Sequence, residues 1–483
     1  MKPEPNSPTE LQRSAALFDD LPIPAEGPGA PADAPKGRPR VQTAQRNQIE
    51  LRACDLDALL APDHAARTVW TFVQSLDLVP LYARIKAVEG RAGRAAIDPA
   101  ILVGLWLYAT IDGVGSAREL DRLCERDDAY RWLCGGVGVN YHSLADFRTE
   151  HAAWLDAQLT RSVAAMLDRG LVQLNRVAQD GIRVRAHAKA ASFRRRDRLA
   201  RLLAEAREQV EQLKQELHDD PAASSRRQQA ARERAARERE QRLAQALASL
   251  DELDKVQTKH KASAAKHKAA PPPDDEPPGS APPSASDKAG KAERAPRVST
   301  TDSEARVMKM ADGGFRPAFN AQLAVDADTQ IIAALELTNA GTDMQQMAPM
   351  HTQLRQCYGG TPAQWLADGG FAKLEHIETL DAAGTKPYVP VPASRSPAID
   401  PHRPKSGDSV AVAQWRTRMG TAEAAETYKA RAASVECANA QLRRRGLHRF
   451  NVCGTVKARA ILLWHALAHN LMRVAALEAT LAH

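Results

Sequence analysis

The chain has 483 residues and a formal net charge of +7, because 66 Lys and Arg residues outnumber 59 Asp and Glu residues. That length predicts two or three domains, and the modest basic excess permits nucleic-acid binding without requiring it. The six cysteines form no CxxC pair, which argues against a zinc ribbon or a disulfide scaffold.

Aromatic residues are only 5% of the chain, which argues against a protein that binds single strands by base stacking. No stretch has the character of a signal peptide or of a membrane span of about 20 apolar residues. Together with the cysteine pattern, this predicts a soluble protein of the reducing cytoplasm with no membrane partner.

The first third of the chain divides into a tail and a helical region. Residues 1–46 are rich in Pro, Ala and Gly without a hydrophobic period, which predicts a disordered tail. Residues 47–169 carry helix signals, among them Asp98 before Pro99 and a capping box opened by Ser116. Short helices between glycine turns are typical of a helix-turn-helix-like DNA-binding module and equally of a plain helical bundle.

Residues 190–300 predict an insertion into another domain. Apolar residues recur at steps of four and three, which is the seam of a coiled coil, and a second charged helix follows a break at Pro221. We expect an antiparallel coiled-coil hairpin over 190–256 and a disordered Pro/Ala/Lys-rich linker over 257–300. The seam consists of Leu199, Leu203, Ala206, Val210, Leu213 and Leu217.

The segments that flank the insertion, 170–189 and 301–483, alternate between strand and helix. Three strands in succession, then strand–helix alternation, predict a mixed α/β domain with a mixed sheet covered by helices. The first strand should contain a turn or bulge at Asp180-Gly181. The expected strands are 171–184, 305–310, 317–325, 330–337, 364–367 and 387–390, and the expected helices include 343–357, 409–445 and 455–481.

Three carboxylates in this domain are candidates for metal chemistry. Asp180 lies in an apolar strand before a glycine, Asp368 ends a short apolar strand, and Glu436 lies in a helix of small residues. Such carboxylates can hold two Mg²⁺ ions, which clamp the attacking and leaving oxygens of a phosphodiester. Each one taken singly also has an ordinary structural explanation, as a turn or as a solvated helix residue.

The pentapeptide ADGGF occurs twice, at 311–315 and at 367–371. We interpret Asp312 as a hairpin turn, because it lies between two expected strands. Asp368 lies between a strand and a helix, so it is the candidate ligand of the two.

Two basic clusters accompany the carboxylates. One continues directly from Asp180, so that substrate contact is favoured over a structural role, and the other follows Glu436. The second cluster suits either the track of a DNA backbone or an ordinary solvated helix end. The first contains Arg183, Arg185, His187 and Lys189, and the second contains Arg443, Arg444, Arg445, His448, Arg449, Lys457 and Arg459.

In combination, these motifs resemble those of bacterial insertion-sequence transposases of the DDE type. The resemblance covers about 47–190 and 300–475, and several ordered motifs are far more specific than one. The matching stretches are 97–99 (IDP), 116–120 (SAREL), 146–148 (DFR), 177–181 (VAQDG), 302–309 (DSEARVMK), 320–326 (NAQLAVD), 366–371 (LADGGF), the helix with Tyr428, Arg431 and Glu436, and 464–471 (WHALAHNL).

The resemblance implies an RNase H-like catalytic core in which Asp180, Asp368 and Glu436 bind the metal. In the family a Tyr and an Arg precede the Glu, and a Lys often follows seven positions on; this chain has Arg443 there. Arg431 stands five residues before Glu436 instead of the common four, so an ideal helix would place it off the face of Glu436. Asn439 and Arg443 share the face of Glu436.

The implied function is that of a DNA transposase. Two Mg²⁺ ions, replaceable by Mn²⁺, would activate water at the element ends and then the freed 3′-hydroxyl for transfer into target DNA. Expected partners are double-stranded DNA, at terminal inverted repeats and target, and a second copy of the chain, since paired ends need a dimer. The side chains expected to contact DNA are Arg183, Arg185, Lys189, Tyr428, Arg431, Arg443, Arg444 and Arg445.

Such an enzyme would work in the bacterial cytoplasm, associated with the nucleoid when bound to DNA. Two alternatives stay open at this point. One is a non-catalytic DNA-binding or scaffold protein, including an inactive transposase remnant, and the complete carboxylate set argues against it. The other is a stand-alone RNase H-like nuclease, against which the separate helical N-terminal region argues.

Overall fold

The computed structural model describes residues 55–88, 90, 95–219, 226–269, 295–394 and 399–481. The expected tail and most of the expected linker lie outside these residues. For residues 1–46 and 270–294 the predicted disorder therefore stays a prediction.

The N-terminal region is helical, as its capping signals predict. The side chain of Asp98 accepts a hydrogen bond from the Ala100 amide at the start of α3, and that of Ser116 accepts one from the Glu119 amide at the start of α4. After a short 3₁₀ turn, Asp57–Leu59, the helices are α1 (Ala65–Ser75), α2 (Val79–Tyr82), α3 (Pro99–Ile111), α4 (Ala117–Arg126), α5 (Asp128–Cys134), α6 (Tyr141–Glu150) and α7 (Ala152–Asp168).

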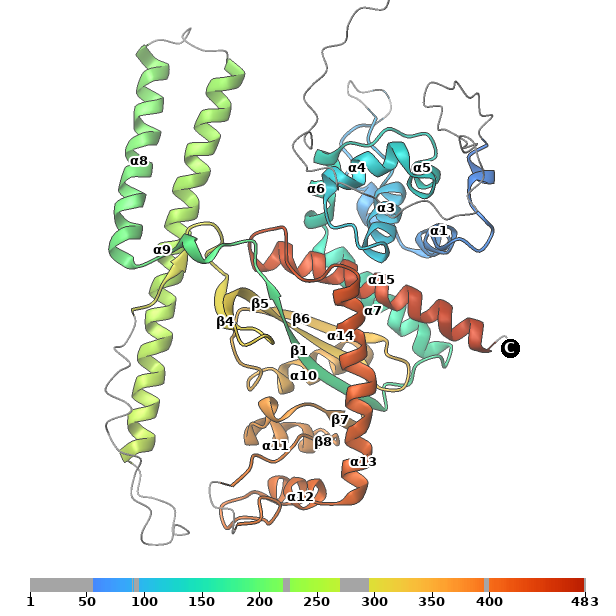
Figure 1. Cartoon of the computed structure of the whole chain (residues 1–483), viewed down its shortest axis with the longest axis vertical. Helices are drawn as coiled ribbons and strands as arrows, with labels where there is room; N and C mark the ends of the chain where they lie inside the picture. Colours follow the sequence, from blue (N-terminus) through green and yellow to red (C-terminus); the bar gives the residue numbers. More distant parts are fainter. Residues whose placement is uncertain are drawn as a thin grey trace, which may run out of the picture. The chain divides into compact units, whose positions relative to one another are not determined.

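These helices share a core with the C-terminal helix α15 (Thr455–Leu481). α15 packs against α3, α6 and α7 and also against the sheet (Figure 1). The buried indole of Trp464 donates to the Arg148 carbonyl, and the Arg148 guanidinium stacks over the ring of Trp106. One continuous core therefore joins segments from the two ends of the described chain.

The length and composition of α15 correct the expectation that no segment is apolar enough to span a membrane. A window within Thr455–Thr480 has a mean hydropathy of 1.3, and 67% of that window is buried inside the protein. A buried core helix passes the same test of length and hydropathy, and α15 packs on both helices and sheet.

The sheet has six strands around a central β1 (Arg176–Arg185). β1 pairs antiparallel with β5 (Phe315–Asp326) and parallel with β7 (Gln364–Leu366), and β7 pairs parallel with β8 (Lys386–Tyr388). The far edge of β5 pairs first with β4 (Arg306–Lys309) and then with β6 (Ile332–Thr338). The predicted mixed sheet is therefore confirmed.

The prediction of a turn or bulge at Asp180-Gly181 is wrong. β1 runs straight through this dipeptide, with Asp180 opposite Leu323 and Gly181 opposite Gln322. The glycine serves a different purpose, because a Cβ at position 181 would lie 2.4 Å from Oδ1 of Asp343. Glycine in a strand often marks such a close approach.

The two faces of the sheet are covered by different helices. Side chains alternate along a strand, so Asp180, Ile182 and Val184 share one face of β1. Ile182 and Val184 belong to the core that includes α15, and the turn after α13 packs on β1 and β5. On the other face lie α10 (Met347–Tyr358) and α11 (Leu374–Ala382), which pack on β6 and β8 respectively.

The single long helix expected over 409–445 is divided. It consists of α12 (Val410–Met419), α13 (Ala422–Arg431), a π-helical turn (Ala432–Glu436) and α14 (Cys437–Arg444). The chain leaves α12 at Gly420, and the Thr421 side chain accepts from the Ala424 amide to start α13. Because the N-cap at Thr421 starts a new helix within the stretch, α12 does not continue into α13.

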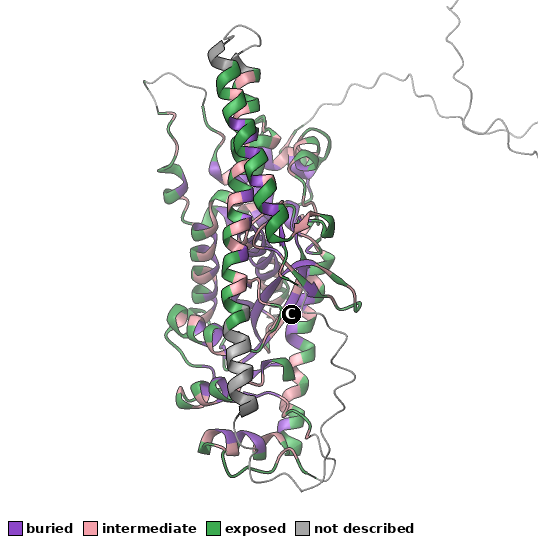
Figure 2. Cartoon of the chain, turned by 90° about the vertical axis from the view of Figure 1, so that its left-hand side faces the viewer, coloured by how far each residue is buried: buried purple, intermediate pink, exposed green. Residues whose placement is uncertain are grey.

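The insertion forms a hairpin of two helices, α8 (Arg196–Asp219) and α9 (Arg226–Ala269) (Figure 1). Ion pairs join Arg196 to Asp251 and Arg207 to Glu240, so the helices run antiparallel. Exposed residues dominate the outer surface of the pair (Figure 2). The buried seam contains Leu199, Leu203, Ala206, Leu243, Ala246 and Leu250.

The ends of the insertion lie next to each other. Short strands β2 (Phe193–Arg194) and β3 (Val298–Ser299) pair antiparallel on either side of the hairpin. α9 continues to Ala269, past the boundary expected at residue 256, so the disorder predicted for 257–269 is wrong. The hairpin thus enters and leaves the sheet-containing part of the chain at one place.

Candidate active site

One carboxylate lies within β1, and a second lies just after the end of the neighbouring parallel strand β7. Ala178 of β1 pairs with Leu366 of β7, and Asp180 and Asp368 each follow two residues later. Asp368 caps a 3₁₀ turn, Gly369–Phe371, by accepting a hydrogen bond from the Gly370 amide. Ligand sites of open sheets form at this edge, where parallel strands end.

The third carboxylate comes from the helices that cover this face. Glu436 ends the π-helical turn between α13 and α14, and this turn packs on β1. α13 and α14 form one nearly continuous column beside the sheet (Figure 1). The side chains are exposed to different degrees: 18% for Asp180, 43% for Asp368 and 52% for Glu436.

Arg431 joins the three carboxylates. Its Nη2 lies 3.0 Å from Oδ1 of Asp180 and 4.0 Å from Oδ2 of Asp368, and its Nη1 lies 2.7 Å from Oε1 of Glu436. The Arg431 side chain is only 11% exposed. The expectation that Arg431 points away from Glu436 is therefore wrong.

The π-helical turn explains this geometry. In an α-helix, residues five apart point in different directions, whereas a π-helical turn accommodates one extra residue. The turn Ala432–Glu436 begins directly after Arg431, ends at its partner Glu436 and absorbs the additional residue. Arg431 and Glu436 consequently share a side, as residues four apart do in a regular helix.

Burial and neighbouring charges have opposite effects on the pKa values of Asp180 and Arg431. Burial raises the pKa of Asp180, Arg431 lowers it, Asp368 raises it again, and the net direction is upward. Burial alone would lower the pKa of Arg431, but Asp180 and the other acidic neighbours outweigh it and raise the pKa. Arg431 therefore stays protonated among the carboxylates.

Asn439 holds the second oxygen of Asp180. Its Nδ2 donates to Oδ2 of Asp180 over 2.8 Å, and its own Oδ1 is buried without a hydrogen-bond partner. The sequence placed Asn439 on the face of Glu436, one turn later, but indicated no role for it. A buried amide beside a metal-binding candidate is the type of residue that orients a ligand.

The oxygen donors suit a hard divalent cation such as Mg²⁺. Carboxylates from three elements already converge on one positive charge, that of Arg431. Within the described ranges, no three His, Cys, Asp or Glu side chains form a ready-made metal cluster. The residue types therefore fit a metal, although Arg431 and Asn439 already occupy both oxygens of Asp180.

The basic cluster after Asp180 is divided between the two faces of the sheet. The Arg183 guanidinium pairs with Asp343 at 2.8 Å and also donates to Asn320, on the face away from Asp180. Arg185 and Lys189 are exposed. Contact of these three side chains with DNA stays a prediction, and for Arg183 the internal ion pair competes with it.

The basic cluster after Glu436 is also mixed. Arg443 and Arg444 are exposed at the end of α14. Arg445 is half-buried beside His469, at 3.3 Å from its Nδ1. Tyr428 lies close enough to the site for Arg431 and the acidic side chains to influence its pKa, which burial raises.

Other candidates lie elsewhere. Asp312 forms the β4–β5 hairpin turn, where it accepts from the Gly314 amide and pairs with Arg316, so its predicted turn role is confirmed. Glu304, from the DSEARVMK stretch, accepts from the Thr455 amide and hydroxyl at the start of α15.

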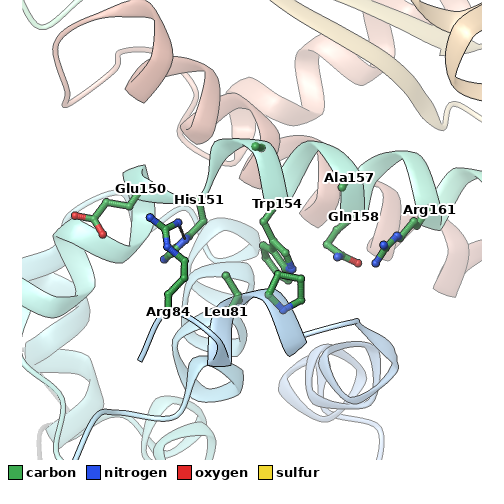
Figure 3. A pocket seen from close by; sticks show the side chains of 10 residues that line it. Leu81, Arg84, Glu150, His151, Trp154, Ala157, Gln158 and Arg161 are labelled. Carbon is green, nitrogen blue, oxygen red and sulfur yellow. Dashed lines mark hydrogen bonds between the residues drawn. The ribbon is translucent and has the colours of Figure 1, made fainter. Parts of the chain in front are cut away.

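A cavity of about 340 Å³ lies between α2 and α7 (Figure 3). Trp154 and Leu81 form its apolar wall, and Arg84 contacts Nδ1 of His151 at 3.1 Å. It shares no lining residue with the three carboxylates.

Two family models match the chain. The model of the Transposase DDE domain matches residues 290–471, and that of the Transposase domain DUF772 matches residues 54–150. The chain belongs to the insertion-sequence DDE transposases. No curated protein and no solved structure matches it.

The protein is accordingly a DNA transposase, an enzyme that transfers phosphoryl groups on DNA with a divalent metal. The matched DDE range contains Asp368, Glu436 and Arg431. Asp180 lies outside both matched ranges, before the insertion. Its association with the other two carboxylates depends on the pairing of β1 with β7.

Proposed function

We propose that this transposase hydrolyses a phosphodiester at each end of its element and transfers the freed 3′-hydroxyl into target DNA at a site built by Asp180, Asp368 and Glu436. The observation that carries this proposal is the convergence of the three carboxylates on Arg431, from β1, the end of β7 and the turn before α14. No packing or capping requirement accounts for all three carboxylates together.

The proposed core is RNase H-like. Its support is the strand order β6-β5-β1-β7-β8, with an antiparallel half and a parallel half that meet at β1. Of the proposed ligands, Asp180 lies on β1, Asp368 follows the end of β7, and Glu436 lies in the π-helical turn that covers them. The proposal is supported by the general tendency of ligand sites to form where the direction of strand pairing in a sheet changes.

The three carboxylates would hold two Mg²⁺ ions, or Mn²⁺ in their place, which activate the attacking oxygen and stabilise the leaving one. Asp368 and Glu436 are the more exposed pair and would meet the incoming phosphate, whereas Asp180 is more buried and is held by Asn439. Arg443 follows Glu436 by two helical turns, so its exposed guanidinium is available to the DNA backbone.

The helices over 47–169 would recognise the element ends, and Arg185, Lys189, Arg444 and Tyr428 would contact DNA beside the site. The hairpin of α8 and α9 would act as a coiled coil that pairs two subunits, because two ends must be joined at once. The bacterial cytoplasm and nucleoid would be the place of action.

The experiment is cleavage of a plasmid that carries the native flanking DNA, with Mg²⁺ or Mn²⁺ against EDTA. The proposal predicts metal-dependent nicks at the element boundary that Asp180→Asn abolishes. Nicks without preference for the boundary would indicate a general nuclease. Binding to the ends without any cleavage would indicate an inactive remnant.

A further inference from the structure

Both oxygens of the Asp180 carboxylate already accept hydrogen bonds. One oxygen accepts from Arg431 over 3.0 Å, and the other accepts from Asn439 over 2.8 Å. The side chain is 18% exposed, so few other partners can reach it. A metal that binds Asp180 must therefore share an oxygen with Arg431 or with Asn439, or displace one of them.

Arg431 contacts all three carboxylates from a single position. The π-helical turn brings this guanidinium to Glu436, and the same group reaches Asp180 and Asp368 on two strands. A planar guanidinium can bridge carboxylates in this way, whereas a single ammonium cannot bridge several with the same geometry. Its Nε is buried without a hydrogen-bond partner, so both Nη atoms carry the interaction.

We propose that Arg431 is an exchangeable cation, which holds the three carboxylates together and competes with divalent metal for them. This inference rests on the proposed function, because it takes the three carboxylates as the metal ligands. Three carboxylates at close range repel one another, and a positive charge among them offsets this repulsion. A divalent ion supplies more charge but is itself repelled by the guanidinium.

The competition makes a prediction opposite to that of a supporting role. If Arg431 merely positioned the ligands, its removal would weaken metal binding. If it competes for the same oxygens, its removal strengthens metal binding and leaves the carboxylates more dependent on the metal.

The test is a Mn²⁺ titration of the full-length protein without DNA, in which electron paramagnetic resonance reports the free ion. Arg431→Gln should bind Mn²⁺ about tenfold more tightly than the wild type, because a unit charge near the site is removed. Arg431→Lys keeps the charge but loses the planar guanidinium that bridges the carboxylates, so it should bind Mn²⁺ about threefold more tightly than the wild type. Equal or weaker binding by these variants would overturn the proposal.

A second readout is thermal unfolding. In EDTA, Arg431→Gln should melt below the wild type, and Mn²⁺ should raise its melting temperature by more than it raises that of the wild type. Equal metal-induced shifts would contradict the competition. If Arg431→Gln does not fold, the Mn²⁺ affinity of Arg431→Lys decides by itself.

Arg416→Gln is the matched control. Arg416 is also a buried arginine in an ion pair, with Asp408 at 2.7 Å, but it contacts none of the three carboxylates. Its removal should leave Mn²⁺ affinity unchanged, and a tightening there would show a non-specific effect of charge and overturn the proposal.

Asp180→Asn separates this inference from the proposed function. If Asp180→Asn loses Mn²⁺ binding but Arg431→Gln does not tighten it, only the competition is wrong. If Asp180→Asn binds Mn²⁺ as the wild type does, the proposed metal site itself is wrong.

Discussion

The guanidinium of Arg431 lies 2.7 Å from the carboxylate of Glu436, five residues further along the chain. A regular α-helix would not bring this pair together, and the π-helical turn Ala432–Glu436 does. The same guanidinium reaches Asp180 on the central strand, so one irregular turn aligns the covering helices with the sheet. The architecture of the site depends on this local departure from helical geometry.

Removal of one residue from the π-helical turn should be tolerated. Deleting Ala433 restores the four-residue spacing of a regular helix, so Arg431 and Glu436 still share a face. Insertion of one alanine at the same place should rotate Glu436 away by about 100°. We expect boundary cleavage within about tenfold of the wild type for the deletion and none above background for the insertion.

Circular dichroism distinguishes these outcomes from unfolding, since both variants should keep the helical content of the wild type. Loss of cleavage in both variants would show that the π-helical turn itself is required, and not only the relative orientation of Arg431 and Glu436.

Gly181 should tolerate no side chain. A Cβ there would approach Asp343 Oδ1 and Gln322 Nε2 at 2.4 Å each, within a buried hydrogen-bond network. Gly181→Ala should reduce the free energy of unfolding by about 1–3 kcal/mol, the usual cost of overpacking. Urea unfolding measures this change.

Gly138→Ala is the control for that substitution. A Cβ at position 138 would meet nothing within 4 Å. Its effect should stay within about 0.5 kcal/mol, as at ordinary surface positions. Equal costs at the two glycines would refute the steric explanation.

Asn439 should matter for the rate of cleavage more than for DNA binding. Its amide fixes one Asp180 oxygen, and partners of metal ligands commonly affect activity about 10–100-fold. Asn439→Ala should therefore lower the cleavage rate by about that factor, with end binding in a gel-shift assay unchanged. A parallel loss of binding would instead indicate a disturbed DNA interface.

His469 should make the fold sensitive to acid. Burial lowers its pKa to about 4, Arg445 lies beside its Nδ1, and its Nε2 lies 2.8 Å from the Gln330 carbonyl. Arg can only donate, so Nδ1 accepts and Nε2 carries the proton. As the pH falls below the unfolded pKa of about 6.5, the unfolded chain binds a proton that the folded protein does not, and stability is lost down to about pH 4.

The loss attributable to His469 should approach about 3 kcal/mol at pH 4. Urea unfolding from pH 7 to pH 4 measures it, and His469→Gln should have a flatter profile than the wild type. Identical profiles would show that His469 titrates normally.

The sequence predicted local features better than contacts between distant segments. The caps at Asp98 and Ser116, and the different local settings of Asp312 and Asp368, follow from residues that are neighbours in the chain. The purpose of Gly181 depends on Asp343, which is remote in the sequence and near in the fold. The Asp180-Gly181 dipeptide therefore suggested a turn, whereas the packing around position 181 requires a residue that has no side chain.

The role of the Arg431 helix shows the same limit. Its spacing from Glu436 was visible in the sequence, but the interpretation assumed a regular helix, which the π-helical turn replaces. Asn439 was correctly placed on the face of Glu436, yet its partner Asp180 comes from another element. Helical periodicity predicts the direction in which a side chain points. The residue that it contacts is determined by how the helix packs on the sheet.

The most direct test of the proposed site compares two aspartates in identical pentapeptides. Asp368→Asn and Asp312→Asn make the same chemical change within the sequence ADGGF, once at the end of β7 and once in a hairpin turn. In the plasmid assay with Mg²⁺, we predict that Asp368→Asn abolishes boundary cleavage and that Asp312→Asn cleaves as the wild type does. Cleavage by Asp368→Asn at the wild-type rate would contradict the assignment of this site.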